Sequence, residues 1–465
     1  MINTNICSNE VTKMFFNNPI FDYNREPSRD ILCIDCKSFY ASVEAVDHGL
    51  DPLAAKLVVM SYPSGARTER GSGLILAASP AAKKAYGISN VSRARDLPFP
   101  YPQDLYIYPP RMRRYMQKNR EVNQIYQTYV DEANHHVYSV DESFLDVTDS
   151  LKLFHAESAY ELAQQIQQSV REKLGIVTTI GIGDNPLLAK VALDNAAKKS
   201  PDMIAEWRYE DVPNTLWQVA ELTDMWGIGK RTARKLHGMG IETVYDLAHT
   251  SYYQLKDLFG IMGTQLYAHS WGIDRSFLGD TYRPREKTIG NSQILPYDYT
   301  NPQEIELVIK EMADQVGMRL RKQGYTAQHL SLFIGYSKGF IDSQGKTAFK
   351  QRAAMYPTNQ SKELADNALR LFRERYTGQM VRSIGLTTGQ LNTDGAIQLN
   401  LFTDSKSQEK EIKIDHIVDK IREKYGFKSI VHAASLLNGG RAIARSQLVG
   451  GHAGGMAGIH NDFDG

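Results

Sequence analysis

The sequence is poor in cysteine and has no long apolar run. Three cysteines in 465 residues exclude a disulfide framework of the kind that holds small secreted domains together, and they favour a reducing compartment. No apolar run approaches the roughly 20 residues that a membrane span needs. Residues 1–29 lack the basic-then-apolar layout of a signal peptide. We therefore expect a cytoplasmic protein that does not act on a membrane.

The few cysteines also argue against a structural zinc site. Cys33 and Cys36 have the spacing of half such a site, but zinc needs a second pair of Cys or His ligands. No such pair stands nearby in the sequence, so we interpret the two cysteines as small buried residues.

An excess of one charge sign is missing as well. The formal net charge is +1, so the whole-chain charge neither indicates nor excludes a nucleic-acid partner. Local patches are what meet phosphate, and residues 285–400 carry 15 Lys and Arg against 11 Asp and Glu. With 42% hydrophobic and 23% charged residues over this length, we expect a globular protein of about three domains.

Two stretches carry the strongest chemical signal. In residues 31–44 an apolar run ends on Asp35, and in residues 138–146 the pair Asp141-Glu142 stands between apolar residues, as at the tip of a hairpin. A carboxylate just past the end of a buried strand is exposed and is aimed by a rigid element. Three such carboxylates would form an oxygen-rich site fit for two Mg²⁺ ions and a triphosphate. The competing interpretation is ordinary solvated turn chemistry.

The order of elements around these stretches indicates an α+β fold. Strand, helix, hairpin, helix and strand in that order form a ferredoxin-like split βαβ unit, which puts Asp35 and the hairpin tip on adjacent central strands. A small mixed segment at 50–108 ends in Pro- and Tyr-rich sequence that we interpret as a return crossing. The expected elements are strand 30–35, helix 40–46, strands 56–61 and 74–78, helix 81–86, helix 111–131, the hairpin, helix 159–174 and strand 176–182.

In residues 214–275 the sequence predicts short helices around a Gly-Ile-Gly turn. Gly227 and Gly229 allow close backbone approach, and the helix that begins at Lys230-Arg231 points free N–H groups and cations outward. A helix-hairpin-helix of this kind grips DNA phosphates without reading sequence. A P-loop is rejected because no Gly stands at the required spacing before Gly229-Lys230, and a plain helix turn stays open as an alternative.

The C-terminal part begins with a linker at 276–285. Residues 286–396 then repeat the earlier pattern as a second βαββαβ sheet, with Arg and Lys suited to lie along a duplex backbone. Residues 398–402 form a short hydrophobic peptide, which is either a strand end or a docking peptide that inserts Leu and Phe into a partner's pocket. One more helix is expected within 407–437, and 438–465 is a Gly-rich tail.

These motifs resemble those of the Y-family of DNA polymerases, the translesion enzymes, and within it those of the UmuC-type branch. The likeness runs from about residue 30 to 437 in the family's order, and it implies a right-hand architecture. The motifs are Ile34-Asp35-x-x-x-Phe39-Tyr40-Ala41-Ser42-Val43-Glu44, Ser139-Val140-Asp141-Glu142-Ser143-Phe144-Leu145-Asp146, Gly181-Ile182-Gly183 with Leu188-Ala189-Lys190, and Gly227-Ile228-Gly229-Lys230. The implied parts are an N-terminal extension (1–29), palm (30–46 and 109–213), fingers (47–108), helical thumb (214–275), little finger (286–396) and a C-terminal part (397–465) with a clamp-binding peptide and a tail.

The resemblance also implies residue roles. The metal-binding carboxylates would be Asp35, Asp141 and Glu142, joined by the main-chain carbonyl of Cys36, and they would hold two Mg²⁺ ions, for which Mn²⁺ can substitute. These ions would serve nucleotidyl transfer from a dNTP to a primer 3′-OH. The residues that would meet the nucleotide are Phe39, Tyr40 as the steric gate under the sugar, Lys84 in the fingers, and Lys198 in the palm, where Lys199 competes for the role.

Two positions depart from the family's pattern. Ala81 stands where a Tyr is frequent, which removes one phosphate-binding hydroxyl. Lys37 stands where a carboxylate or a small residue is common, which places a cation near the metals.

The resemblance implies primer–template DNA, dNTP and a sliding clamp (the β subunit of DNA polymerase III) as partners, and a UmuD-like accessory protein is a further candidate. We expect a template-directed, low-fidelity DNA polymerase of damage tolerance, of the SOS type. One alternative is a clamp-tethered DNA-binding scaffold, which would not need three intact carboxylates. Another is a nucleotide cyclase, which would leave the hairpin and the docking peptide unexplained.

The resemblance also implies residues for the macromolecular partners. The DNA-binding residues would be Gly227, Gly229, Lys230 and Arg231, and the clamp-binding residues would be Gln398, Leu399, Leu401 and Phe402.

Overall fold

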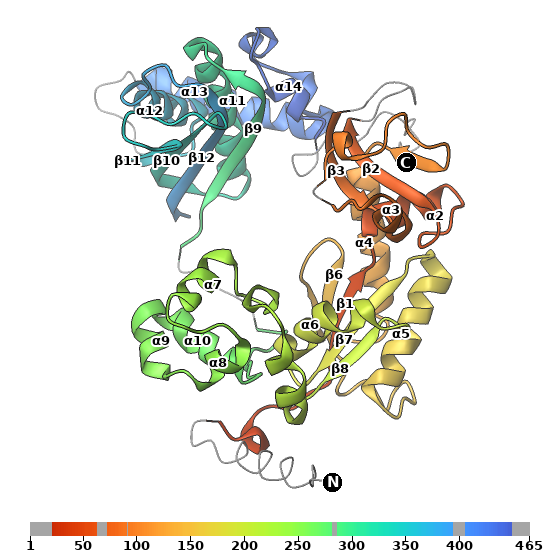
Figure 1. The fold of residues 1–465 in the computed structure, drawn as a ribbon. Coiled ribbons are helices and arrows are strands. Elements are labelled where there is room, and N and C mark those ends of the chain that lie inside the picture. Colours follow the sequence, from red (N-terminus) through yellow and green to blue (C-terminus); the bar gives the residue numbers. More distant parts are fainter. Residues whose placement is uncertain (1–20, 63–71, 91, 281–285, 394–404, 449–465) are drawn as a thin grey trace, which may run out of the picture. The chain divides into compact units, whose positions relative to one another are not determined.

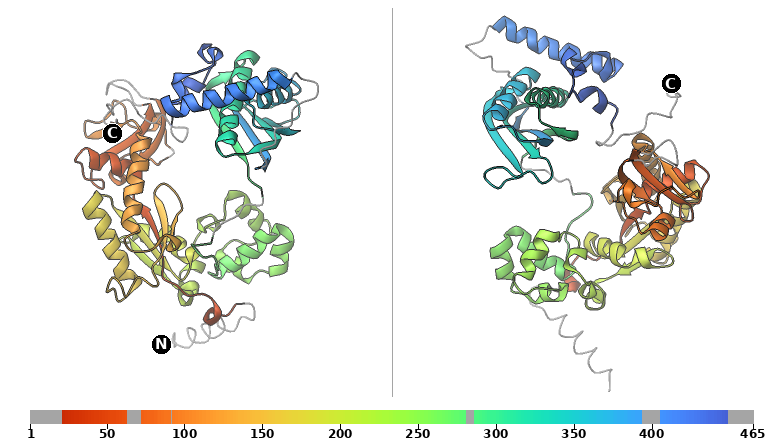
Figure 2. Two further views of the ribbon diagram at one scale, coloured as in Figure 1. Left: turned by 180° about the vertical axis from the view of Figure 1, so that it is seen from behind. Right: turned by 45° about the horizontal axis from the view of Figure 1, so that its top comes forward.

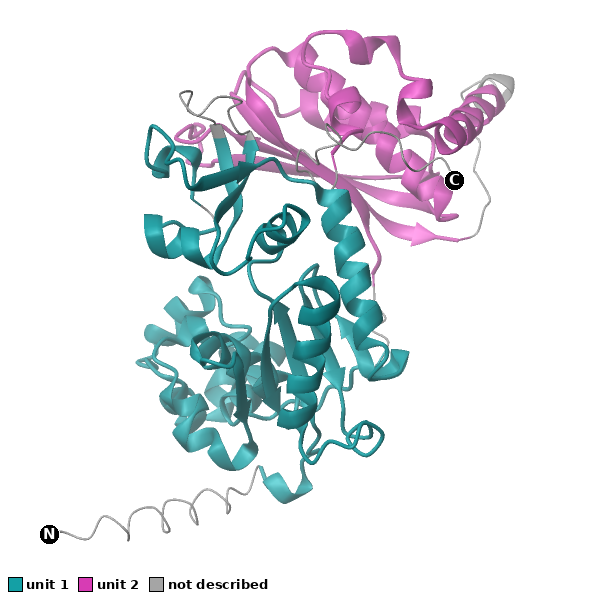
Figure 3. Cartoon of the chain, turned by 90° about the vertical axis from the view of Figure 1, so that its right-hand side faces the viewer, with its two compact units in different colours: residues 1–281, 457–465 teal, residues 282–456 magenta. Residues whose placement is uncertain are grey.

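The chain forms two compact units. The computed structural model describes residues 21–62, 72–90, 92–280, 286–393 and 405–448. One unit comprises residues 1–281 with 457–465, and the other comprises residues 282–456 (Figure 3). The division falls within the segment expected to be a linker. Among the described helices, none is both long and apolar enough to cross a membrane.

A five-stranded sheet lies at the centre of the first unit (Figure 1). Strand β1 is antiparallel to both of its neighbours, β6 and β7, and β7 runs parallel to β8. Asp35 at the end of β1 pairs with Glu142 on β6, so the acid and the hairpin lie on adjacent strands as expected. The sheet order is β5 (His135–Val137), β6 (Glu142–Asp146), β1 (Ile31–Cys36), β7 (Thr178–Gly183) and β8 (Ile204–Trp207).

Helix α6 (Pro186–Asn195) packs directly on this sheet. Its N-cap is Asn185, whose side chain accepts a bond from the Leu188 N–H, and Pro186 stands at the first helical position. A Cβ at Gly181 would lie only 2.1 Å from the Ala189 carbonyl oxygen. Glycine is therefore required for this close approach of helix and strand. Two further helices, α4 (Met112–Tyr126) and α5 (Ala159–Leu174), pack against each other, and α5 also packs on β7.

A smaller three-stranded sheet, ordered β3-β2-β4, holds the expected fingers segment. The prediction of a plain return crossing at 98–110 was wrong, because β4 pairs in parallel with β2. The Pro-rich flanks hid a four-residue strand whose Leu105 is buried. The elements are α2 (Phe39–Asp47), β2 (Lys56–Tyr62), β3 (Ser72–Ala78), α3 (Pro80–Tyr86) and β4 (Leu105–Tyr108).

Short helices complete the first unit, and the N-terminal segment ties them to the sheet. The helices are α7 (Lys230–His237), α8 (Val244–His249), α9 (Tyr252–Phe259) and α10 (Ile261–Ser270). The Tyr23 hydroxyl donates to the Trp271 carbonyl at 2.8 Å, and Arg275 forms a two-pronged ion pair with Glu26. Residues 21–29 therefore pack against the helices as part of the fold.

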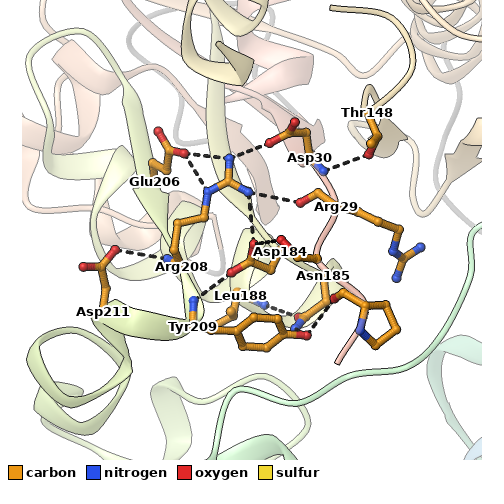
Figure 4. Close-up of polar contacts among 12 residues, drawn as sticks. Arg29, Asp30, Thr148, Asp184, Asn185, Leu188, Glu206, Arg208, Tyr209 and Asp211 are labelled. Atoms are coloured by element: carbon orange, nitrogen blue, oxygen red, sulfur yellow. Dashed lines mark hydrogen bonds and ion pairs between the residues drawn. The ribbon is translucent and has the colours of Figure 1, made fainter. Parts of the chain in front are cut away.

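One guanidinium joins the edge strand β8 to the start of β1 (Figure 4). Arg208 donates to Asp30 Oδ1 at 2.6 Å and to Asp184 Oδ1 at 3.3 Å. The main-chain N–H of Tyr209 donates to the other oxygen of Asp184 at 2.7 Å. Because this network spans the two strands on either side of β7, it fixes the base of the sheet from which β1 carries Asp35.

The second unit is built on a four-stranded antiparallel sheet covered by helices on one face. On β10 the buried residues Leu330, Leu332 and Ile334 alternate with more accessible ones such as Phe333, which is the pattern of a sheet with one packed face. The βαββαβ order is confirmed. The elements are β9 (Ile289–Tyr299), α11 (Pro302–Lys322), β10 (Thr326–Tyr336), β11 (Ala348–Thr358), α12 (Ser361–Arg373) and β12 (Val381–Asn392), and the sheet order is β11-β10-β12-β9.

The C-terminal part contains the expected helix but differs in its tail. Helix α13 (Ser405–Tyr425) is the helix expected within 407–437, and a further helix, α14 (Ala442–Arg445), lies within the expected tail. Figure 2 shows α13 against the helices of the second unit, where Arg321 forms ion pairs with Asp415 at 2.9 Å and Asp419 at 2.6 Å. Glycine content indicated a tail, but the described residues 438–448 pack on α11 through backbone bonds to Glu311.

Candidate active site

A cavity of about 450 Å³ opens beside the end of β1. It gathers groups from the five-stranded sheet, from the start of α2 and from α3, so residues far apart in sequence meet there. Its lining includes Asp35, Cys36, Lys37, Ser38, Phe39, Tyr40, Pro80, Lys83, Asn90, Asp141, Thr179 and Lys198.

Asp35 sits in an electrostatically strained position at this cavity. Its pKa is raised to about 7, chiefly by burial and also by the neighbouring charges of Asp141 and Glu142, against the lowering effect of Lys198 and Lys190. A carboxyl group with two other acids beside it is stabilised in its charged form by a bound cation. The arrangement therefore favours cation binding at Asp35.

Asp141 and Glu142 are adjacent in sequence but are held differently. Asp141 lies in the turn before β6, where its Oδ1 accepts from the Ser139 hydroxyl at 2.8 Å and its carbonyl accepts from the Cys36 N–H at 2.8 Å. Glu142 begins the strand, and its Oε1 lies 2.7 Å from Lys190 Nζ. The turn thus lets Asp141 line the cavity, while Glu142 is engaged by a helix α6 lysine.

The side chains at this cavity include possible ligands for a metal ion. Within the described residues, no three His, Cys, Asp or Glu side chains are grouped closely enough to hold an ion. The donor set still fits a hard divalent cation, because the carboxylates of Asp35 and Asp141 line one cavity with Cys36. The Thr179 hydroxyl, also in the lining, is buried and has no hydrogen-bond partner among the described atoms. Glu142 would complete the set by exchanging Lys190 for the ion.

A row of alternating charges connects Glu142 to Lys198, which lines the cavity. Lys190 bridges Glu142 and Asp194, the latter at 2.9 Å, and Lys198 pairs with Asp194 at 2.6 Å. Burial lowers the pKa of Lys198, but the charges of Asp35 and Asp194 outweigh burial and leave it raised. Lys198 lines the cavity of Asp35, whereas its predicted competitor Lys199 lines a neighbouring cavity.

The fingers lysine that faces the cavity is Lys83. Its Nζ donates to the Ser38 hydroxyl at 3.2 Å, and burial together with Lys198 and Lys37 lowers its pKa against the opposing effect of Asp35. Lys84, which the resemblance singled out, is exposed and lies outside the lining. Ser38 has a φ of 49°, in the left-handed region that residues other than glycine seldom adopt and that collects at functional sites.

Tyr40 is positioned by a stack of aromatic and charged groups. Its ring stacks on that of Tyr115, with centroids 4.5 Å apart. The buried Tyr115 hydroxyl donates to Glu44 at 2.6 Å, and Arg111 donates to the same carboxylate from two of its nitrogens. Phe39 is only 2% exposed and supports the start of α2. The half-buried Tyr40 ring is thereby fixed at the cavity wall.

The Gly-Ile-Gly turn adjoins this region. Gly227, with a φ of 91°, and Gly229, the N-cap of α7, line a cavity of about 720 Å³ with Asp194 and Lys199. Lys230 and Arg231 are exposed at the start of α7. Trp226 joins the turn to the acidic hairpin, because its indole N–H donates to the Tyr138 hydroxyl at 3.3 Å.

Four residues with clear places at the site carried no assigned role in the sequence. Which of Lys83 and Lys84 faces the cavity depends on how α3 is rotated about its axis. The sequence of a seven-residue helix does not determine that rotation. Lys190 was visible within a motif, but its partner Glu142 comes from another strand. Tyr115 and Trp226 contact Tyr40 and Tyr138 from other segments of the chain, and the sequence alone does not show these contacts. The peptide 398–402 lies outside the described residues.

The fold and the site together define a class. Two carboxylates, three cavity lysines and an aromatic wall stand on a ferredoxin-like sheet, beside a helix-hairpin-helix turn in the same unit. These are the parts of a nucleic-acid polymerase with right-hand architecture, in which the central sheet is the palm and the second unit contains the little finger.

Comparisons with known proteins give the family. Residues 34–194 match the impB/mucB/samB family, residues 286–401 match its C-terminal domain, and residues 223–274 match the thumb domain of DNA polymerase iota. The chain belongs to the Y-family of translesion DNA polymerases and is a DNA-directed DNA polymerase.

Individual relatives cover nearly the whole chain. DNA polymerase IV 2 of Bacillus subtilis (strain 168) is 34% identical over 91% of this chain and 98% of its own length. A second protein of that strain, whose name UvrX refers to UV-damage repair, is 41% identical over 93% of this chain and all of its own length. A Y-family chimera of Dbh and Dpo4 covers 78% of this chain and 99% of its own, with a TM-score of 0.60 and 22% identity, which supports the fold.

Proposed function

We propose that this polymerase copies past damaged template positions with low fidelity, in an SOS-type damage response, by two-metal nucleotidyl transfer from a dNTP to the primer 3′-OH. The observation that carries the proposal is that Asp35 and Asp141 share one cavity with Tyr40 and Lys198. Acidic groups for cations, lysines for phosphates and a ring for the sugar are what this reaction needs within one nucleotide length.

The proposed cation ligands are Asp35, Asp141, Glu142 and the Cys36 carbonyl, and the proposed ions are Mg²⁺ with Mn²⁺ as a substitute. When bound, such ions lower the pKa of the attacking hydroxyl and neutralise charge on the α-phosphoryl group. Lys190 forms an ion pair with Glu142, which limits repulsion among the three acids.

The protein's own residues position the nucleotide. Lys83 and Lys198 face the cavity from the fingers and the palm, so they are placed to bind the triphosphate from two sides. Lys37, a departure from the family's pattern, lines the same cavity and adds a third cation. Tyr40, held by Tyr115, is the proposed steric gate against a 2′-hydroxyl. Lys84, which the resemblance gives the same role, is exposed and outside the cavity lining, so we propose that its contribution is minor.

DNA and accessory proteins complete the proposal. Gly227, Gly229, Lys230 and Arg231 would grip primer–template phosphates through main-chain N–H groups and cations. Residues 398–402, with Leu401 and Phe402 as anchors, would dock in the sliding clamp. A UmuD-like subunit is a further proposed partner.

Primer extension on undamaged and abasic templates, with and without Mg²⁺, tests the polymerase proposal. We expect Mg²⁺-dependent extension past the abasic site, and we expect Asp141→Ala to abolish extension while duplex binding stays nearly unchanged. Extension by Asp141→Ala at the wild-type rate would remove the site assignment. Duplex binding without extension by the wild type would favour the scaffold alternative.

A separate measurement tests the clamp peptide. Replacing both Leu401 and Phe402 by Ala should weaken binding to the purified β clamp without changing clamp-free extension. Equal clamp binding by the double variant and the wild type would show that the peptide has no such role.

A further inference from the structure

A second cavity, in the little-finger unit, has the chemistry of a nucleotide site. Its volume is about 520 Å³, within the range of small-molecule sites, and it lies between β9, α11 and the C-terminal residues 427–448. It is formed entirely within residues 282–456 and is separate from the Asp35 cavity.

Two arginines line this cavity, and none of the described residues in its lining is acidic. Arg319 donates to the Gly290 carbonyl at 2.7 Å, and Arg445 donates to Asn291 Oδ1 at 3.3 Å. In the part of the chain that the structure describes, neither guanidinium forms an ion pair with a carboxylate. The nearby Arg321, by contrast, pairs with Asp415 and Asp419.

The electrostatic effect of this imbalance reaches Arg445 itself. Burial lowers the pKa of Arg445, and the positive charges of Arg441 and Arg319 lower it further, against a single opposing carboxylate, Glu311. Glu311 is already engaged, because one of its oxygens accepts the main-chain N–H groups of Arg441 and Ala442. A bound anion would relieve the repulsion between Arg319 and Arg445.

The lining of the cavity also includes apolar side chains and an aromatic ring. Met318 and Phe427 are both half-buried in the lining. The Arg422 guanidinium lies 4.5 Å from the Phe427 ring centroid and fixes that ring. Asn291 and Gln315 also line the cavity, where the Asn291 side-chain amide donates to the Gln315 side-chain oxygen.

We propose that this cavity binds a nucleoside phosphate, with the phosphate between Arg319 and Arg445 and the base against Phe427 and Met318. Guanidinium groups bind phosphate oxygens with paired N–H donors, and aromatic rings stack on bases of any sequence. The same chemistry is offered by a free nucleotide and by one nucleotide of a single DNA strand. Bound there, the ligand would join α14 to α11 and β9, so it would stabilise the C-terminal part against the little finger.

Photolabelling of the full chain distinguishes the two sources. One probe is 8-azido-2′-deoxyadenosine 5′-monophosphate in EDTA, and the other is a short single-stranded oligonucleotide with one 4-thiothymidine. Mass spectrometry then locates the label, and label near Tyr40 reports the polymerase site separately. Label on the peptide that contains Phe427 from the mononucleotide would identify a free nucleotide as ligand, and label from the oligonucleotide alone would identify a DNA strand.

Variants tie the label to the proposed groups. We expect Arg319→Gln and Arg445→Gln each to weaken binding about tenfold or more, since each removes a charge-assisted bond to phosphate. Arg370→Gln removes the same charge from an exposed position on helix α12 and should leave binding unchanged. Phe427→Leu keeps the apolar packing but removes the ring, so it should weaken labelling. This variant tests the proposal even if an arginine variant folds poorly. No label at Phe427 from either probe, or label unaffected by all three site variants, would overturn the proposal.

Discussion

Asp35 and Glu142 lie directly opposite each other in the antiparallel pair of β1 and β6, yet their carboxylates have different surroundings. Asp35 lines the cavity, where Lys198 is the strongest opposing charge, whereas Glu142 is bound by Lys190 at 2.7 Å. Paired residues of antiparallel strands project to the same face. The two acids are therefore close. Each has a different lysine as its main positive neighbour, Lys190 of α6 for Glu142 and Lys198 for Asp35.

Removal of Lys190 should destabilise the protein. Lys190→Ala leaves Glu142 as a largely buried carboxylate without its cation, and we expect a loss of about 3 kcal/mol in the free energy of unfolding. The matched control is Lys322→Ala, whose pair with Glu423 is exposed on both sides and should contribute between about 0 and 1 kcal/mol. Urea unfolding measures both, and equal losses would contradict the role given to Lys190.

The pKa of Asp35 predicts a pH dependence of stability. Because its folded pKa of about 7 exceeds the unfolded value, the folded state binds the proton more tightly. The folded protein should therefore lose stability as pH rises from about 4 to 7, by at most about 4 kcal/mol from this group. Asp35→Asn removes the effect, so in metal-free buffer the variant should match the wild type near pH 4 and exceed it at pH 8. Parallel curves for the two proteins would refute the assignment.

The two fingers lysines should differ in their effect on nucleotide use. Lys83→Ala removes a cation that lines the cavity, and kcat/KM for dNTP should fall roughly tenfold to a hundredfold, as for a lost bond to a charged group. Lys84→Ala, the neighbouring control, changes an exposed residue and should alter kcat/KM by less than about threefold. Steady-state single-nucleotide incorporation measures both, and the reverse order would restore Lys84 as the phosphate ligand.

Tyr40 should set the sugar preference. Tyr40→Ala opens the cavity wall under the sugar, so the ratio of kcat/KM for dNTP over rNTP should fall on the order of tenfold or more. Tyr40→Phe keeps the ring that stacks on Tyr115 and should keep the ratio. Competition between a dNTP and its rNTP on one template gives this ratio, and an unchanged preference in Tyr40→Ala would reject the gate.

Much of the fold could be predicted because local pattern and tertiary packing agree. The apolar run before Asp35, the acidic hairpin and the second βαββαβ unit all carry their periodicity in the sequence. Strand β4 was missed because its four residues stand between prolines, and a parallel partner far along the chain stabilises it. The C-terminal residues 438–448 were missed because glycine content says nothing about the Glu311 carboxylate that receives their N–H groups.

The sequence was enough to predict which acids form the site, but not which lysines contact those acids or the cavity. Sequence order placed Asp35 beside Asp141 and Glu142 because strand neighbours follow from topology. It could not separate Lys83 from Lys84, since that choice depends on how α3 turns toward the cavity. Nor could it pair Lys190 with Glu142, because that contact joins a helix to a strand some 50 residues earlier.

Direct counting of bound cations tests the central claim, that Asp35 and Asp141 form one divalent-cation site for nucleotidyl transfer. Electron paramagnetic resonance titration with Mn²⁺ would be made on the full chain with a dideoxy-terminated primer–template and the next dNTP. We predict two tightly bound ions for the wild type, and loss of at least one in Asp35→Asn and in Asp141→Asn. The same number and affinity of ions in all three proteins would contradict the claim.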